Sequence, residues 1–383
     1  MARFTRRRYL AVGAVTALAG CSTAGTNDRG NYDPEDDPSD RAGSTVSTHE
    51  PGCAGSNWEI RDGQLTEVPT ADNRLPLPRS PSDLRSASLS GGPPKDGIPS
   101  IDQPAFADAN GVDFLSDGDP VFGIVHEGVA KAYPQKILVH HEIVNDTIGD
   151  QPIAVTYCPL TGTVLGFERG ETTFGVSGRL INNNLVMYDR ATESWWPQVL
   201  ATAIPGPWND DPPTVSLRER RLVWTTWGQW RAQHPETRIL TTDTGYARNY
   251  GTDPYGSRGY YDDGDTLFAR LNPDDRFHAK RVFIGARTPA GAVAFGKEAL
   301  IDAGVMTGQL CETPVVAVAD PRLDTAYVFL NPDERAFEHD GTTVVSEDGT
   351  DYRPEDLPLR RIHAFDAMWF AWSGFYPWTN VYV

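Results

Sequence analysis

Lysine is scarce in this sequence, and positive charge as a whole is outweighed. The 383 residues include 52 Asp and Glu against 34 Lys and Arg, a formal net charge of −18, and only five basic residues are lysines. Binding to phosphate backbones requires a basic patch, which the sequence lacks, so we expect no nucleic-acid partner. An acidic, lysine-poor surface suits high salt, where screening removes self-repulsion. The composition therefore predicts a haloarchaeal protein.

The N-terminus lacks an apolar run long enough to cross a bilayer, which takes about 20 residues. A shorter run, Tyr9 to Gly20, follows three adjacent arginines, a pattern typical of an export signal. The arginines followed by Tyr9-Leu10 resemble a twin-arginine signal, and the residues ending at Cys21 resemble a lipobox. Residues 1–21 are predicted to engage the twin-arginine export machinery. A lipid on Cys21 would then anchor the chain to the outer face of the cytoplasmic membrane, at the cell surface.

Cysteine is also rare. Besides the predicted lipidation site, the chain has Cys53, Cys158 and Cys311. An odd number of cysteines in an exported protein leaves at least one thiol free or paired outside the chain. Residues 22–95 are acidic and rich in Gly, Ser and Pro. We expect them to form a tether, disordered from 22 to about 60, because such a composition cannot offset the entropy lost on ordering.

Helical patterns are few in residues 96–383, which we expect to form the globular domain. Short β-branched and aromatic runs such as VFGIV and PIAVTYC, separated by Gly, Pro and Asp, predict β-strands. The helical candidates are 223–235, 296–304 and 365–375. The fold class predicted is α+β and β-dominated.

An internal repeat refines this fold prediction. Residues 121–159 align with 283–321 at a constant shift of 162 and without gaps. We therefore expect two related, duplicated β-rich units, about 121–168 and 283–330, packed into one compact globular region.

The two copies differ in their polar residues. His140, His141 and Glu142 align with Asp302, Ala303 and Gly304, and Cys158 aligns with Asp320. A polar set needed only to build the frame should be present in both copies. Its loss from the second copy favours a function in the first.

The candidate site lies in HHEIVNDTIGDQPIAVTYCPLTGT, residues 140–163. Gly149-Asp150 predicts a hairpin between strands 141–146 and 153–158, which would place His141 opposite Cys158, since paired positions would sum to about 299. Turn amides, the imidazole and the Thr161 hydroxyl would lower the thiol pKa from about 8.5. Cys158, His141 and Thr161 are the catalytic candidates. The alternative is a buried, inert cysteine.

Further polar residues are expected beside this hairpin. Asn145, Asp189 and Arg190 are candidates for substrate binding, with Arg190 holding an anion bidentately. Alternatively, Asp189 and Arg190 form a structural ion pair that closes a turn. Met187 is expected in the core, although its thioether next to His141 and Cys158 would suit a copper ion.

The motifs HEIVND…TYCPLTGT, FGVSGRLINNNLVMYDRATESWW and AMWFAWSGFYPWT resemble the DUF3179 family of exported proteins, from about Asp96 to the C-terminus. The resemblance implies no activity, and it points to His141. Many members have Cys-Pro-Leu-Cys where this chain has Thr161 as the fourth residue, and some are described as selenoproteins. A CxxC disulfide cycle is thus in doubt here.

Three functions follow as hypotheses. The first is thiol-redox chemistry with Cys158 as nucleophile and His141 as its base or thiolate partner. The second is a binding module for copper or another soft metal, held by His141, Cys158 and Met187. The third is a non-catalytic cell-surface lipoprotein.

Overall fold

The computed structural model describes residues 52–55 and 58–383. The predicted signal, the lipobox with Cys21 and residues 22–51 and 56–57 of the predicted tether lie outside these residues. The described residues all belong to the unit that spans 47–383. Within them, no helix is both long and apolar enough to cross a membrane.

Strands make up 37% of the structure and helices 11%, which confirms the β-dominated fold. The helices are short because each of the helical candidates is bounded by extended residues. Two of them begin with strands, since VWTT and AFDAM pair with neighbouring sheets. The helices are α1 (Pro81–Ser86), α2 (Gln135–Leu138), α3 (Trp227–Gln233), α4 (Lys297–Ala303) and α5 (Trp369–Phe375), with short 3₁₀ turns η2 (Ala109–Gly111) and η3 (Gly256–Arg258).

Two sheets, which we call the N-terminal sheet pair, contain the predicted site. The first has the strand order β12-β3-β4-β13-β2 and the second β11-β7-β6-β5. Their strands are β2 (Phe106–Asp108), β3 (Pro120–His126), β4 (Val129–Pro134), β5 (Ile143–Ile148), β6 (Gln151–Cys158), β7 (Thr163–Glu168), β11 (Glu219–Arg220), β12 (Val223–Thr226) and β13 (Arg238–Leu240).

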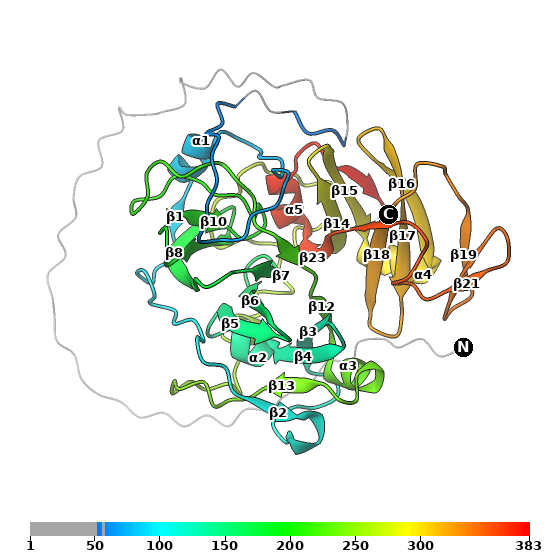
Figure 1. Cartoon of the computed structure of the whole chain (residues 1–383), viewed down its shortest axis with the longest axis horizontal. Coiled ribbons are helices and arrows are strands. Elements are labelled where there is room, and N and C mark those ends of the chain that lie inside the picture. Colours follow the sequence, from blue (N-terminus) through cyan, green and yellow to red (C-terminus); the bar gives the residue numbers. More distant parts are fainter. Residues whose placement is uncertain (1–51, 56–57) are drawn as a thin grey trace, which may run out of the picture. The chain divides into compact units, whose positions relative to one another are not determined.

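Two further sheets form the C-terminal sheet pair, with the orders β23-β14-β15-β24 and β16-β17-β18-β22. Figure 1 shows the two pairs in green and in yellow to red, and β7 and β12 contact β23 and β18 where the pairs meet. The strands are β14 (Val282–Thr288), β15 (Gly291–Gly296), β16 (Val305–Leu310), β17 (Thr313–Asp320), β18 (Thr325–Leu330), β22 (Arg360–Ile362), β23 (Ala364–Met368) and β24 (Asn380–Tyr382).

Equivalent strands of the two pairs have the same pairing register. Ile143 pairs with Thr156 in the first, and Val305 pairs with Val318 in the second, 162 residues later in each strand. A tryptophan packs in the same way in both. A Cβ added to Gly123 would lie 2.2 Å from the Trp230 ring, and one added to Gly285 would lie 2.2 Å from the ring of Trp372. Descent of the two pairs from one duplicated unit stays a prediction.

A separate sheet, β1-β8-β9-β10, and a small sheet, β19-β20-β21, complete the fold. In the first of these, β8 and β9 form a hairpin whose turn contains Asn182 and Asn183. The strands are β1 (Leu89–Ser90), β8 (Phe174–Ile181), β9 (Asn184–Asp189), β10 (Trp195–Pro197), β19 (Phe337–His339), β20 (Val344–Ser346) and β21 (Asp351–Tyr352).

The predicted tether boundary at residue 95 is too late. Val68, Leu75, Leu77 and Leu84 are buried in the largest core cluster, and α1 and β1 lie in the same stretch. These apolar residues are isolated between Pro, Gly and charged residues. The sequence therefore has no periodic apolar pattern from which their burial could be predicted. Cys53 is also fixed, because it forms a disulfide with Cys311 in the turn between β16 and β17.

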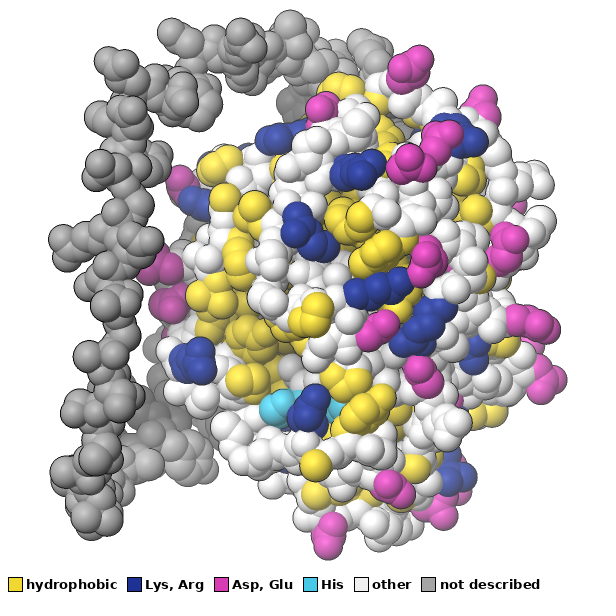
Figure 2. Space-filling view, turned by 90° about the vertical axis from the view of Figure 1, so that its left-hand side faces the viewer, with side chains coloured by type: hydrophobic (Ala, Val, Ile, Leu, Met, Phe, Trp, Pro, Cys, Tyr) yellow, Lys and Arg dark blue, Asp and Glu magenta, His cyan; other side chains and the backbone are white. Residues whose placement is uncertain are grey.

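Acidic and basic side chains are interspersed on the molecular surface. On the face drawn in Figure 2, Lys and Arg lie among Asp and Glu, with apolar side chains between them. Several exposed basic residues there and elsewhere pair with acids, as Arg231 does with Asp117. Local pairing of this kind reduces the repulsion that a net charge of −18 would cause.

Candidate functional site

Strands β5 and β6 form the expected hairpin with the expected register. Ile143 pairs with Thr156, so paired positions sum to 299. The strand, however, begins at Ile143 and not at residue 141. The amides of His141 and Glu142 both bond to the carbonyl of Leu138, at the end of α2, and Glu142 has a positive φ of 59°. Residues 141 and 142 therefore belong to a turn that precedes β5, and His141 does not extend the strand to the position opposite Cys158.

His141 is directed toward other partners. Its side chain is fully buried, and its Nδ1 lies 2.8 Å from the Pro99 carbonyl while Nε2 lies 2.7 Å from the Tyr250 hydroxyl. Because a carbonyl only accepts, Nδ1 is the protonated nitrogen and Nε2 accepts from the tyrosine. Burial lowers the pKa of His141. Both ring nitrogens are engaged, and neither contacts Cys158.

Cys158 is a buried, neutral thiol. It is 1% exposed, its sulfur donates to the Asn183 carbonyl at 3.5 Å, and it accepts from the Leu185 amide at 3.4 Å. Burial, followed by the charge of Glu142, raises its pKa to about 11, whereas hydrogen bonds from Thr161 and Leu185 act in the opposite direction. The expected lowering of the pKa is thus reversed, because no cation among the described residues offsets the burial.

Thr161 lies beside the Cys158 sulfur. Both its hydroxyl and its amide act on the Cys158 sulfur. The hydroxyl also lies 2.8 Å from the Thr163 hydroxyl and accepts from Asn184 at 3.0 Å. These contacts fix the turn after β6, so Thr161 orients the sulfur. A catalytic role for it stays a prediction.

Glu142 was not among the predicted site residues. Its side chain is 8% exposed, its carboxylate has no hydrogen-bond partner among the residues described, and burial raises its pKa to about 8. The left-handed backbone costs a residue with a side chain about 1–2 kcal/mol. The equivalent position in the C-terminal pair is Gly304, with φ of 76°. The alignment of a glutamate with a glycine was the sequence signal for this residue.

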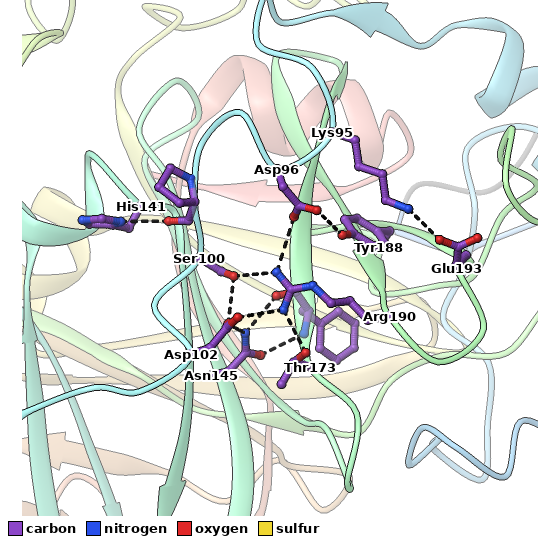
Figure 3. A network of polar contacts seen from close by, with 12 residues as sticks. Lys95, Asp96, Ser100, Asp102, His141, Asn145, Thr173, Tyr188, Arg190 and Glu193 are labelled. Carbon is purple, nitrogen blue, oxygen red and sulfur yellow. Dashed lines mark hydrogen bonds and ion pairs between the residues drawn. The ribbon is translucent and has the colours of Figure 1, made fainter. Parts of the chain in front are cut away.

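Asn145 and Arg190 meet at a different place, on residues 95–102, which we call the strap (Figure 3). The Asn145 amide donates to Asp102 at 2.6 Å, and Arg190 donates to the other oxygen of Asp102 at 3.0 Å. Arg190 also donates to Ser100 at 2.9 Å. The strap is thereby fixed along β5, where Ile101 bridges Val144.

The strap gives the polar residues of the first copy a structural use. His141 donates to Pro99, while Asn145 and Arg190 hold Asp102. In the C-terminal pair, β16 is an edge strand as β5 is, but among the described residues no segment outside the named strands bridges it as Ile101 bridges β5. The absence of these residues from the second copy is therefore explained by packing, with Glu142 and Cys158 as exceptions.

Asp189 and Met187 have structural environments. The Asp189 carboxylate accepts from the Thr192 amide at 2.6 Å and from the Trp196 indole at 2.9 Å, and it closes the turn after β9 without pairing to Arg190. Met187 is fully buried between the neighbouring strands. Its core position agrees with expectation, and the substrate role of Asp189 stays a prediction.

A metal-binding donor set is not assembled at this site. No group of three His, Cys, Asp or Glu side chains is gathered in the described part of the chain. Both nitrogens of His141 are engaged by Pro99 and Tyr250, and the Cys158 sulfur is bonded to backbone groups. These residues do not fit copper in this arrangement.

Comparison with known proteins gives a family and nothing closer. A family model described as "Protein of unknown function (DUF3179)" matches residues 95–379, in agreement with the resemblance seen in the motifs. No curated protein matches the sequence, and no solved structure matches it. The site itself is then the guide to function.

Proposed function

Because the chain belongs to the DUF3179 family, whose description gives no function, we propose one from the site. Cys158 is the reacting thiol of an exported, membrane-anchored thiol-redox protein, and Glu142, not His141, accepts the thiol proton. The support for export and anchoring is the twin-arginine-like signal and the lipobox at Cys21. The support for the chemistry is the buried pair.

The observation that carries this proposal is the unfavourable setting of Glu142. Its side chain is 8% exposed, its carboxylate accepts no hydrogen bond from the described residues, and its backbone has a positive φ of 59°. A glycine occupies the equivalent position in the other sheet pair, so the fold does not require a side chain there. Backbone strain and pKa values raised by burial cluster at functional sites. The charge of Glu142 acts directly on Cys158.

The reaction that suits this pair is exchange with a small disulfide. The Cys158 sulfur attacks one sulfur of the disulfide, a new S–S bond forms and the old one breaks. The thiol proton passes to Glu142, which then gives a proton to the leaving thiolate. A second small thiol then attacks the mixed disulfide, which restores the Cys158 thiol and releases a new small disulfide, so the net reaction is thiol–disulfide exchange. With a pKa of about 8, roughly a tenth of Glu142 is ionised at pH 7.

The second thiol must come from another molecule. Cys53 and Cys311 are bonded to each other, and Thr161 occupies the position that holds a second cysteine in many relatives. Cys158 is the free cysteine of the described residues. The proposal is therefore a one-cysteine cycle that depends on small external thiols.

The test is the rate at which Cys158 reacts in Glu142→Gln. If Glu142 only repels the thiolate, its removal lowers the thiol pKa and the reaction becomes faster. If Glu142 is the base, the reaction slows by about 10²-fold or more. The measurement is mixed-disulfide formation with a small disulfide, followed by mass spectrometry of the whole protein at pH 7–9.

Two controls accompany this test. Cys158→Ser gives the background. Asp146→Asn removes a different buried carboxylate, which lies on β5 and is bonded to Lys131 and Tyr133. The rate of mixed-disulfide formation should stay within about twofold of that of the unaltered protein. Faster exchange in Glu142→Gln, or no exchange in the unaltered protein, would overturn the proposal and favour a non-catalytic surface lipoprotein.

A further inference from the structure

Residues 242–267, which we call the covering segment, have almost no regular structure. They lie between β13 and β14, and η3 is their one helical turn. They include five tyrosines and five glycines. Loops of this length inside a compact fold are usually functional, and active-site lids are a common case.

The covering segment lies over Cys158 and Glu142. Tyr260 is 4% exposed and belongs to the same core cluster as Cys158. Its hydroxyl donates to the Leu160 carbonyl at 2.7 Å, two residues beyond the thiol. The charges of Glu142 and Cys158 raise the pKa of Tyr255 further above the value that burial gives it. The two tyrosines thus supply part of the burial of the reacting pair.

Residues of the quoted motifs hold this segment in place. The Tyr250 hydroxyl donates to His141 at 2.7 Å, and His140 donates to the Thr252 carbonyl at 3.0 Å. Just after the segment, the Asn183 side chain donates to the Phe268 carbonyl at 2.9 Å and accepts from its amide at 2.8 Å. The C-terminal end is therefore fixed by Asn183, while residues 250–252 depend on a few polar contacts with His140 and His141.

Apart from its buried and half-buried tyrosines, the segment has little apolar burial of its own. Tyr246 near its start is 44% exposed, and Leu267 at its end is 60% exposed. Gly245 and Gly259 have positive φ values of 78° and 75°, which give the backbone freedom beside the tyrosines. Segments with few buried contacts open locally at a lower free energy than the whole fold.

We propose that residues 242–267 are a lid that opens over Cys158, with Tyr250 and His141 as its latch and Asn183 at its hinge. This lid regulates the thiol chemistry proposed above and rests on that proposal for its purpose. Closed, it excludes small disulfides from the sulfur. Open, it admits them and lets water reach both members of the pair. Burial is the first cause of the raised pKa of Cys158, so opening also makes the thiol more acidic.

The experiment measures how fast Cys158 is alkylated in the folded, full-length protein. Tyr250→Phe removes one buried hydrogen bond of the closed lid and should raise the alkylation rate by a small factor of about five. Tyr246→Phe is the matched control, because its hydroxyl has no hydrogen bond among the described residues, and should leave the rate unchanged. Trypsin should cleave Tyr250→Phe first at Arg248 or Arg258, both within the lid.

Denaturant separates local from global opening. An alkylation rate that is flat at low urea indicates the lid, whereas a rate that follows global unfolding from zero urea overturns it. An unchanged rate in Tyr250→Phe overturns it as well. Because alkylation needs no redox partner, faster alkylation without exchange with small disulfides supports the lid and refutes only the proposed function.

Discussion

Replacing Glu142 with Gln should change how the stability of the fold depends on pH. The carboxyl has a pKa near 4.5 in the unfolded chain and about 8 in the folded one. Between these values the folded state binds one more proton than the unfolded state. Stability therefore falls as pH rises from 4.5 to 8, by about 1.4 kcal/mol for each pH unit. Glutamine does not titrate, so this dependence should be absent from Glu142→Gln.

The difference between the two proteins is the quantity to measure. Relative to the unaltered protein, Glu142→Gln should gain about 3 kcal/mol of unfolding free energy between pH 5 and pH 7. The gain should level off above pH 8, where the carboxylate is ionised in both states. Urea unfolding at pH 5, 6, 7 and 8.5 provides the values, with the salt concentration held constant.

Two further variants make this result specific to Glu142. Glu142→Gly should be about 1–2 kcal/mol more stable than Glu142→Gln at every pH, because the left-handed backbone suits glycine. Asp146→Asn, which removes a carboxylate paired with Lys131, is the control for the loss of a buried carboxylate elsewhere. A free-energy difference between Glu142→Gln and the unaltered protein that stays constant from pH 5 to pH 8.5 would refute the reasoning.

Three other predictions concern the frame around the site. Gly123→Ala should destabilise the fold by about 1–3 kcal/mol, because the added Cβ would lie 2.2 Å from an indole ring. Gly118→Ala is the control and should not destabilise the fold, because Gly118 has open space around it. Thermal unfolding compares the two variants. Arg190→Ala should cost about 1–3 kcal/mol by releasing the strap, and faster hydrogen exchange at residues 95–102 should accompany the loss. Burial lowers the pKa of His363 to about 4, so the unfolded chain takes up a proton first on acidification; stability should fall between pH 6.5 and 4, and His363→Gln should flatten that fall in urea titrations.

The sequence was informative about the frame because its signals were local. The hairpin of β5 and β6 and its register followed from the alternation of residues and from Gly149-Asp150. Apart from β2, the strands of the two sheet pairs follow the same order, while the duplication inferred from the repeat stays a prediction. The prediction that His141 faces Cys158 was wrong, because it required the strand to begin at residue 141. The strand begins at Ile143, after the positive φ of Glu142. The alignment with Gly304 was the sign that the backbone turns there.

Other features depended on distant contacts and had no local signal. The pairing of Cys53 with Cys311 joins residues 258 positions apart, and three cysteines allow several pairings. The strap could not be predicted from the sequence, because Ser100 and Asp102 lie in a stretch without a periodic pattern of apolar residues. The lid was missed for a similar reason, since its glycines and tyrosines resemble those of an ordinary connecting loop.

The disulfide between Cys53 and Cys311 determines how mechanical load would pass through the molecule. If the chain is anchored at Cys21, at most about 115 Å of extended tether separates the membrane from Cys53. Tension from flow or from a bound partner would leave the tether at Cys53 and enter β16 and β17 through a covalent bond. Residues 58–95, which are held by packing and hydrogen bonds without a covalent link, would then be spared from peeling, and the strap beside β5 would keep its position under strain.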